Sequence, residues 1–431
     1  MKLFTILVLC SVPGFLRPAF SQNTQPDPRQ RARTAHDLVK QGTDGIPSLI
    51  PYLSDADLNV RLEAVKSLDD IGGPKTVDAL VQAARDNDPE IQIRAADGLV
   101  NVYLPGYIKT GITGTLKRAG NAVKVKFPDA NDQIIEGFVD VRPEVIQVLG
   151  RQTRGGASLE CRANAARALG VLRGQAAVPD LTEALHSKDT QLMYEALVAL
   201  QKIRDPAAGP AIGALVRDLE EKVQIAALQA VGIFRTQEAA PEVRKALERA
   251  SNSRVRREAL TALAMIADPA DHPLFVRYLA DKDDGLRAAA AEGIARLKNP
   301  VDRQHMEEMF TAEHGLSPRL SIAFAVVGLG NREVSEFSPL QYLVNNLNSK
   351  VYRPTAMAFL TELARDLSLR QAIYPQLKSA TKDEKTGLSI VFARSGDQDS
   401  EPYLETLQKD PDPDVMQEGM RSLRTLRARL P

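Results

Sequence analysis

The chain of 431 residues has no tryptophan, and aromatic residues make up only 5% of it. So few rings favour closely stacked helices built from Ala and Leu. Charge of one sign is also lacking, because 55 basic residues balance 55 acidic ones. A dedicated nucleic-acid-binding protein normally carries a strong basic excess. We therefore expect no nucleic-acid partner.

Long hydrophobic runs are absent except near the N-terminus. Lys2 precedes a compact apolar run over 3–12, and small residues then lead up to Ser21, which is the pattern of a secretory signal peptide. The run is too short to serve as a transmembrane anchor. We expect cleavage after Ser21 and export to a periplasm or to the outside. A lipoprotein at Cys10 is disfavoured, because Leu9 is not the small residue that such a site prefers.

Cysteine occurs only at Cys10 and Cys161. Removal of the signal peptide would leave Cys161 alone, so the mature chain would have no intramolecular disulfide. Cys161 stands at a position where other repeats, described below, carry valine, isoleucine or leucine. We therefore interpret it as a small buried hydrophobe and not as a reactive thiol.

The chain also lacks the motifs of common catalytic sites. It has no glycine-rich phosphate loop, Walker motif, nucleophile elbow or paired-cysteine zinc motif. His305 and Glu308 stand one helical turn apart, but with their acidic neighbours they fit a solvated helix face better than a metal site. We expect no catalytic residue, no cofactor and no metal.

A repeat of 31 to 34 residues runs through most of the chain. We call its reference position the anchor. Three residues after each anchor comes a mostly small residue, such as Ala64, and seven after it an apolar one, such as Leu68. A fixed period in this range is the signature of a stacked repeat. The anchors are Arg61, Gln92, Arg162, Met193, Gln224, Arg256, Arg287, Arg319, Arg353, Lys385 and Met416.

Each repeat carries the signals of two helices. Neither helix can bury its apolar stripe alone, so the units must stack. The first helix commonly opens with a proline, which is tolerated in a first turn; these are Pro47, Pro179, Pro210, Pro241, Pro273, Pro339 and Pro402. The second follows a residue whose side chain caps exposed backbone N–H groups; these are Asp57, Asp88, Asp189, Asn252, Asp283 and Asp412.

This pattern resembles the HEAT repeat, particularly the short bacterial form also seen in phycobilisome-lyase-like proteins. The segments 60–64, 161–170 and 255–259 carry the resemblance, which covers 44–104 and 142–431. It implies an all-α fold, a right-handed α-solenoid of about eleven helix pairs. HEAT-like deoxyhypusine hydroxylase needs paired His-Glu steps to hold iron, and this chain has none. A bilin lyase role conflicts with export, because that chemistry is cytosolic.

The recurring arginines at the anchors have two interpretations. A basic stripe for an anionic ligand is one, but Gln92, Met193 and Gln224 would interrupt it. A structural ladder between successive units is the other, and we favour it. Asp57 with Arg61 has the spacing for such a pair.

One interval, from Gln92 to Arg162, is 70 residues long. Four glycines, an alternating segment at 123–127, turn residues and a β-branched stretch at 134–141 predict an inserted loop over 105–141 that contains a β-hairpin. Insertions in repeat arrays often lie on the binding side. The alternative is that the strands fold down over a repeat edge. The candidate partner-binding residues are Lys117, Arg118, Lys124, Lys126 and Phe138.

The expected organisation is a signal peptide (1–21), a flexible leader (22–33), a cap and repeats (34–104, the cap helix at about 34–40), the insert (105–141) and further repeats (142–431). Its last helix is expected to present a polar capping face. We expect a non-catalytic exported scaffold for a protein or peptide partner, bound by the concave face, the insert, or both. An enzyme or enzyme subunit, lyase-like or metal-dependent, with its active site in the insert or on a partner, is the alternative. The partner's identity and the oligomeric state are not specified by the sequence.

Overall fold

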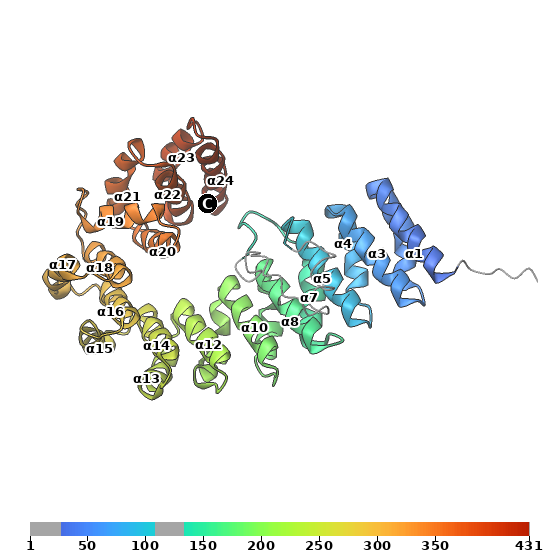
Figure 1. Cartoon of the computed structure of the whole chain (residues 1–431), viewed down its shortest axis with the longest axis horizontal. Helices are drawn as coiled ribbons and strands as arrows, with labels where there is room; N and C mark the ends of the chain where they lie inside the picture. Colours follow the sequence, from blue (N-terminus) through green and yellow to red (C-terminus); the bar gives the residue numbers. More distant parts are fainter. Residues whose placement is uncertain (1–26, 108–132, 431) are drawn as a thin grey trace, which may run out of the picture.

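A computed structural model describes residues 27–107 and 133–430. These residues form helices and connecting turns, without a β-strand among them, and the helices stack in pairs along a curved array (Figure 1). The first helices of the pairs are α2 (Ile46–Leu49), α4 (Val77–Ala83), α7 (Pro143–Gly155), α9 (Val178–Ala184), α11 (Gly209–Gly213), α13 (Ala240–Arg249), α15 (His272–Tyr278), α17 (Arg303–Ala312), α19 (Pro339–Asn345), α21 (Leu367–Ile373) and α23 (Glu401–Leu407).

The second helices are longer and carry the anchors. They are α3 (Leu58–Ile71), α5 (Pro89–Tyr103), α8 (Leu159–Val171), α10 (Thr190–Ile203), α12 (Glu221–Phe234), α14 (Ser253–Ile266), α16 (Asp284–Leu297), α18 (Leu316–Gly328), α20 (Arg353–Leu363), α22 (Lys382–Ser395) and α24 (Pro413–Arg429). The described part of the chain thus contains the eleven helix pairs that the anchor spacing predicts, and the all-α solenoid is confirmed.

The residues predicted to start the helices do so. All six predicted caps accept hydrogen bonds from backbone N–H groups of the following helix; Asp57, for example, accepts from the N–H of Asn59 at 2.9 Å. The seven prolines lie in the first turn of their helices. Proline and cap residues therefore mark both helices of a repeat.

The core runs along the array as one continuous stripe. The positions three and seven residues after the anchors are buried in every repeat, as Ala64 and Leu68 illustrate. Close helix packing explains the preference for small residues. A side chain on Gly170 of α8 would place its Cβ 2.7 Å from the Cα of Ala199 on α10, which is closer than atoms can pack.

The anchor side chains hold the turn between the two helices of a repeat. Arg61 donates from Nη1 to the carbonyl of Asp55 at 2.9 Å and from Nε to the Asp86 carboxylate of the next repeat at 2.8 Å. The carbonyls at a helix C-terminus lack intrahelical partners, and Gln92 supplies the same kind of donor to the Asp86 carbonyl. The predicted ladder is confirmed, but its partner is wrong: Asp57 caps its own helix, and the acid lies in the following repeat.

The N-terminal cap begins earlier than predicted. Helix α1 (Pro28–Asp37) contains residues assigned to a flexible leader, and a 3₁₀ segment over Leu38–Gly45 follows it. Pro28 suits a first helical turn. Arg31 also pairs with Asp55 at 2.7 Å, which ties the helix to the first repeat.

The insert does not interrupt the stack. Helices α5 and α8, which flank it in sequence, pack against each other, and Gln92 Oε1 accepts hydrogen bonds from the Ala157 N–H at 2.9 Å and from the Cys161 thiol at 2.8 Å. Cys161 is buried, as predicted, and burial raises the pKa of its thiol to about 11. No helix of the described residues is long and apolar enough to cross a membrane.

Candidate functional site

The described end of the insert, residues 133–142, lies across the ends of the second helices. The Ile135 N–H donates to the carbonyl of Val171 at 3.0 Å, and Lys202 donates to the carbonyl of Gln133 at 3.1 Å. The strand predicted over 134–141 is wrong. The Ile135 N–H is bonded to a helix end, and a turn between Glu136 and Val139 bends the segment. The other predicted strand, 123–127, lies outside the described residues.

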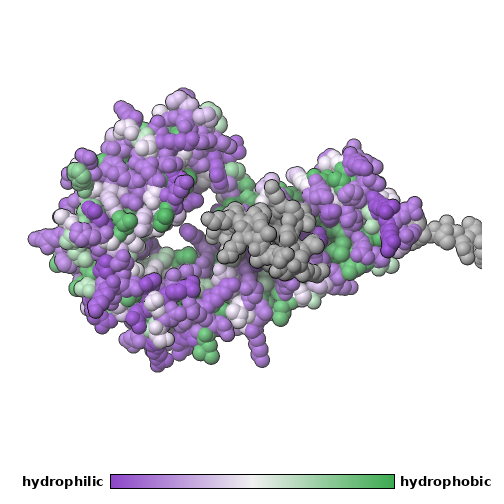
Figure 2. Space-filling view, in the orientation of Figure 1, coloured by the Kyte–Doolittle hydropathy of each residue, from purple (hydrophilic) through white to green (hydrophobic). Residues whose placement is uncertain are grey.

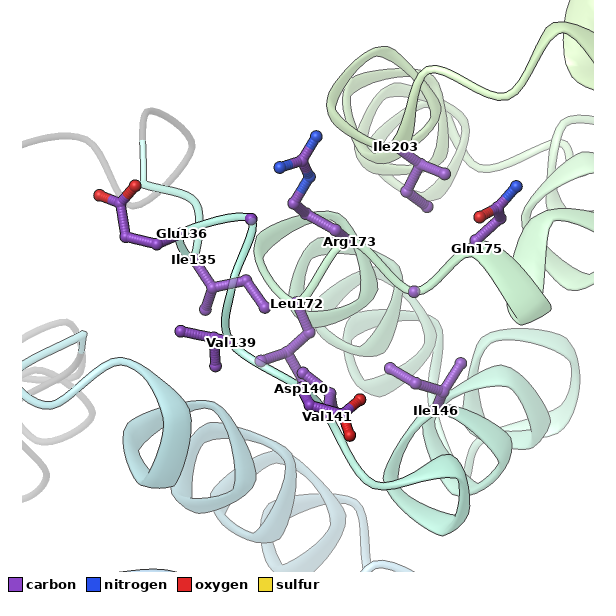
Figure 3. A pocket seen from close by; sticks show the side chains of 12 residues that line it. Ile135, Glu136, Val139, Asp140, Val141, Ile146, Leu172, Arg173, Gln175 and Ile203 are labelled. Atoms are coloured by element: carbon purple, nitrogen blue, oxygen red, sulfur yellow. The ribbon is translucent and has the colours of Figure 1, made fainter. Parts of the chain in front are cut away.

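An open pocket of about 420 Å³ lies beneath this segment. Its apolar wall combines side chains of the segment with those of the helices below, and Arg173 and Gln175 stand at its rim (Figure 3). In Figure 3 Ile135 points toward Leu172, whereas Glu136 points away from the pocket. The apolar side chains of the wall are Ile135, Val139, Val141, Ile146, Leu172 and Ile203.

The same segment joins the two ends of the array. The C-terminal helices curve back toward the middle of the chain (Figure 1), so that Glu136 pairs with Arg421 of α24 and the guanidinium of Arg424 lies 5.5 Å from the Phe138 ring centroid. Phe138, the one predicted partner-binding residue in the described ranges, thus contacts the last helix. Lys117, Arg118, Lys124 and Lys126 lie outside those ranges.

A second contact closes the arc further along. Glu362 of α20 pairs with Arg235, at the end of α12, at 3.2 Å and with Arg296 of α16 at 3.0 Å. Figure 2 shows an opening between the C-terminal helices and the middle of the array, bordered mainly by hydrophilic residues. The inner face of the arc is therefore a partly enclosed polar space.

Arginines recur at the ends of consecutive second helices on this side. Arg173, Arg204 and Arg235 follow α8, α10 and α12, with left-handed φ angles of 51°, 61° and 53°. Each stands eleven residues after its anchor. That regular spacing is the signal in the sequence that locates them, although the anchors themselves were the arginines that drew attention.

Two arginines of the C-terminal helices face this row. Arg365 follows α20 and Arg394 lies near the end of α22, and both are exposed. Surrounding protein, and then the charges of Arg173, Arg394 and Arg365, lower the pKa of the Arg204 guanidinium. Within the described ranges none of these four forms an ion pair. We call Arg173, Arg204, Arg365 and Arg394 the arginine group.

A buried polar cluster lies on α5, α8 and α10. Asp97 accepts a hydrogen bond from the Asn164 amide at 3.0 Å, and Arg167 pairs with buried Glu195 at 2.7 Å. Burial raises the pKa of Asp97 to about 7. Tyr107, where the insert begins, is buried beside this cluster. These groups fasten the base of the insert to the repeats.

The residues considered for a metal site lie elsewhere. His305 and Glu308 are exposed on α17, and Glu308 accepts a hydrogen bond from Gln304 at 3.0 Å. Nearby Glu313 pairs with Arg287 at 2.8 Å and belongs to the ladder. Over residues 27–107 and 133–430, no three His, Cys, Asp or Glu side chains are grouped so that they could hold a metal ion.

Comparisons with known proteins agree with this architecture. No curated protein sequence matches the chain. Among solved structures, an engineered protein shares 19% identity at a TM-score of 0.40, covering 94% of this chain and 97% of its own. The complex of CpcE and CpcF of phycocyanin lyase from Nostoc sp. PCC7120 also shares 19% identity, at a TM-score of 0.37, covering 62% of this chain and 92% of that one.

The family comparison covers more than half of the sequence. The sequence model of HEAT repeats matches residues 16–100, 146–219 and 210–295. Its gap from 101 to 145 coincides with the interval that breaks the repeat period. The chain belongs to the HEAT-repeat family.

Proposed function

We propose that the chain is a non-catalytic, exported scaffold that binds a protein or peptide partner on the inner face of its arc, with the insert over 105–141 as part of the binding surface. HEAT repeats suggest a protein-interaction scaffold, and stacked repeats create extended concave surfaces suited to that task.

The observation that carries the proposal is the position of the insert's base. Residues 133–142 lie between the ends of the second helices and the last helix, at the opening of the arc. A ligand that enters this space meets the base of the insert and the repeats together. Segments placed on a rigid scaffold in this way commonly carry binding function.

Affinity capture from envelope extracts tests the proposal. The wild-type chain is compared with a variant in which residues 108–132 are replaced by a Gly/Ser sequence of equal length, which keeps Ile135 and Phe138 in place. We expect a defined partner that the variant retains more weakly, with an unchanged helical circular dichroism spectrum. No specific partner, or stoichiometric metal that is lost in H305A or E308A, contradicts the proposal.

Export is tested separately. Fractionation of expressing cells and the mass of the purified chain are expected to show a mature protein that begins at Gln22, outside the cytoplasm. A cytoplasmic chain that retains residues 1–21 contradicts this part of the proposal and leaves the scaffold function standing.

A further inference from the structure

The contacts across the opening of the arc alternate in charge. At one end Glu136 pairs with Arg421, and at the other Glu362 pairs with Arg235. Between them stands the arginine group, in which Arg204 is close to Arg365 and Arg394 of the opposite helices. Two matched ion pairs thus flank a cluster of like charges.

The nearest carboxylates do not neutralise this cluster. Glu418 interacts with the charge of Arg394, but it is half-buried and accepts a hydrogen bond from Ser422 at 2.9 Å. Asp205, next to Arg204 in sequence, accepts instead from the Ala207 N–H at 3.0 Å and from Gln175 at 3.3 Å. Holding guanidinium groups together without counter-charge costs free energy, so the arrangement favours an anionic ligand.

We propose that the arginine group binds an acidic segment of the partner protein. This inference rests on the proposed scaffold function and names the chemistry of what it binds. The planar guanidinium fork matches a carboxylate in two-point hydrogen bonding. Arginines from four separate helix ends receive several carboxylates along one stretch of peptide.

The pocket beneath residues 133–142 indicates that the segment also carries an apolar side chain. Arg173 belongs both to the pocket rim and to the arginine group, so the two features are continuous. The apolar wall formed by Ile146, Leu172 and Ile203 offers nothing to a phosphate chain. A peptide that combines one apolar residue with adjacent acidic residues satisfies both features.

The charge distribution separates this ligand from a nucleic acid. The full chain has equal numbers of basic and acidic residues, whereas a nucleic-acid surface usually extends a basic excess along a strand. Here the excess is confined to the opening of the arc. A short acidic segment matches that extent.

Fluorescence anisotropy at low salt tests the inference. The probe is a labelled peptide of one leucine and six glutamates, compared with the same peptide carrying glutamines. The variant R204Q/R394Q removes one arginine from each side of the opening. Its control, R249Q/R277Q, makes the same charge change on exposed arginines of the outer helices α13 and α15.

We expect the glutamate peptide to bind, to lose about tenfold or more in affinity in R204Q/R394Q, and to bind the control variant like wild type. Equal binding to all three proteins, or a polyphosphate or single-stranded oligonucleotide that binds where the peptide does not, overturns the inference. In the capture experiment, a partner retained equally by wild type and R204Q/R394Q likewise overturns it. That last outcome leaves the scaffold function intact, whereas absence of any captured partner counts against the scaffold itself.

Discussion

Arg235 and Glu362, 127 residues apart in the chain, form an ion pair of 3.2 Å that joins the end of α12 to α20. Glu362 also accepts from Arg296, whose side chain is only 8% exposed. In a simple solenoid each repeat contacts only its neighbours. This contact skips several repeats, so it holds the curvature of the arc.

Neutralising Glu362 is expected to loosen the arc. In E362Q the buried Arg296 keeps only Glu292, 3.0 Å away, as a charged partner, which costs about 1–2 kcal/mol. We expect small-angle scattering to show a larger maximum dimension than wild type. The variant E336Q, which changes an exposed acid, is the control. An unchanged scattering profile in E362Q would show that stacking alone sets the curvature.

The anchor arginines perform two tasks that substitution can separate. Arg287 donates to the carbonyl of Asp281 at 2.9 Å and pairs with Glu313 at 2.8 Å. We expect R287Q to keep the carbonyl contact, as Gln92 does in its own repeat, and to lose about 1 kcal/mol. R287M loses both contacts and about 2–3 kcal/mol.

Hydrogen exchange of the turn over 281–286 and urea unfolding measure the difference. Faster exchange in R287M than in R287Q is expected, because only the methionine leaves the helix C-terminus without a donor. Equal exchange in the two variants would show that the ion pair to Glu313 is the only contribution of the anchor.

Asp97 is expected to make the stability of the chain depend on pH. Its pKa is about 7 in the folded state, because burial opposes the charged form, and 3.8 is its ordinary value. The folded chain therefore holds a proton that the unfolded chain has lost between about pH 4 and pH 7. Stability from this group is full below about pH 4 and falls as the pH rises toward 7.

The variant D97N isolates this effect, because an asparagine oxygen still accepts from Asn164 and carries no charge. We expect D97N to match wild type near pH 4 and to exceed it at pH 8 by on the order of 2–4 kcal/mol. Urea unfolding at both pH values measures it. A difference that does not change with pH would mean that Asp97 stays ionised in the fold.

Local patterns in the sequence predict the fold because each repeat is held by residues close in sequence. The anchor spacing, the caps such as Asp57 and the buried Ala64 and Leu68 lie within one helix pair. The strand predicted at 134–141 fails for a related reason. Its β-branched residues pack on helix ends, as Ile135 does at Val171, and a sequence pattern does not say which surface receives them.

The candidate site is much less accessible to sequence reasoning. Arg204 and Arg394 come together only because small rotations between repeats add up until the arc returns on itself. No motif encodes that sum. The ladder partner was misassigned on a smaller scale, since Asp57 lies nearer to Arg61 in sequence while Asp86 lies nearer in space.

Removing a charge from the arginine group is expected to stabilise the free protein. Arg204 lies among like charges that lower the pKa of its guanidinium, after the larger effect of the surrounding protein. Repulsion of this kind is relieved in R204Q, so we expect Tm to rise by about 1–2 °C at low salt, and the gain to shrink at high salt as the charges are screened. The outer-surface variant R277Q is expected to leave Tm unchanged. A lower Tm in R204Q at both salt concentrations would mean that Arg204 stabilises the closed arc, and that its charge is structural and not held for a ligand.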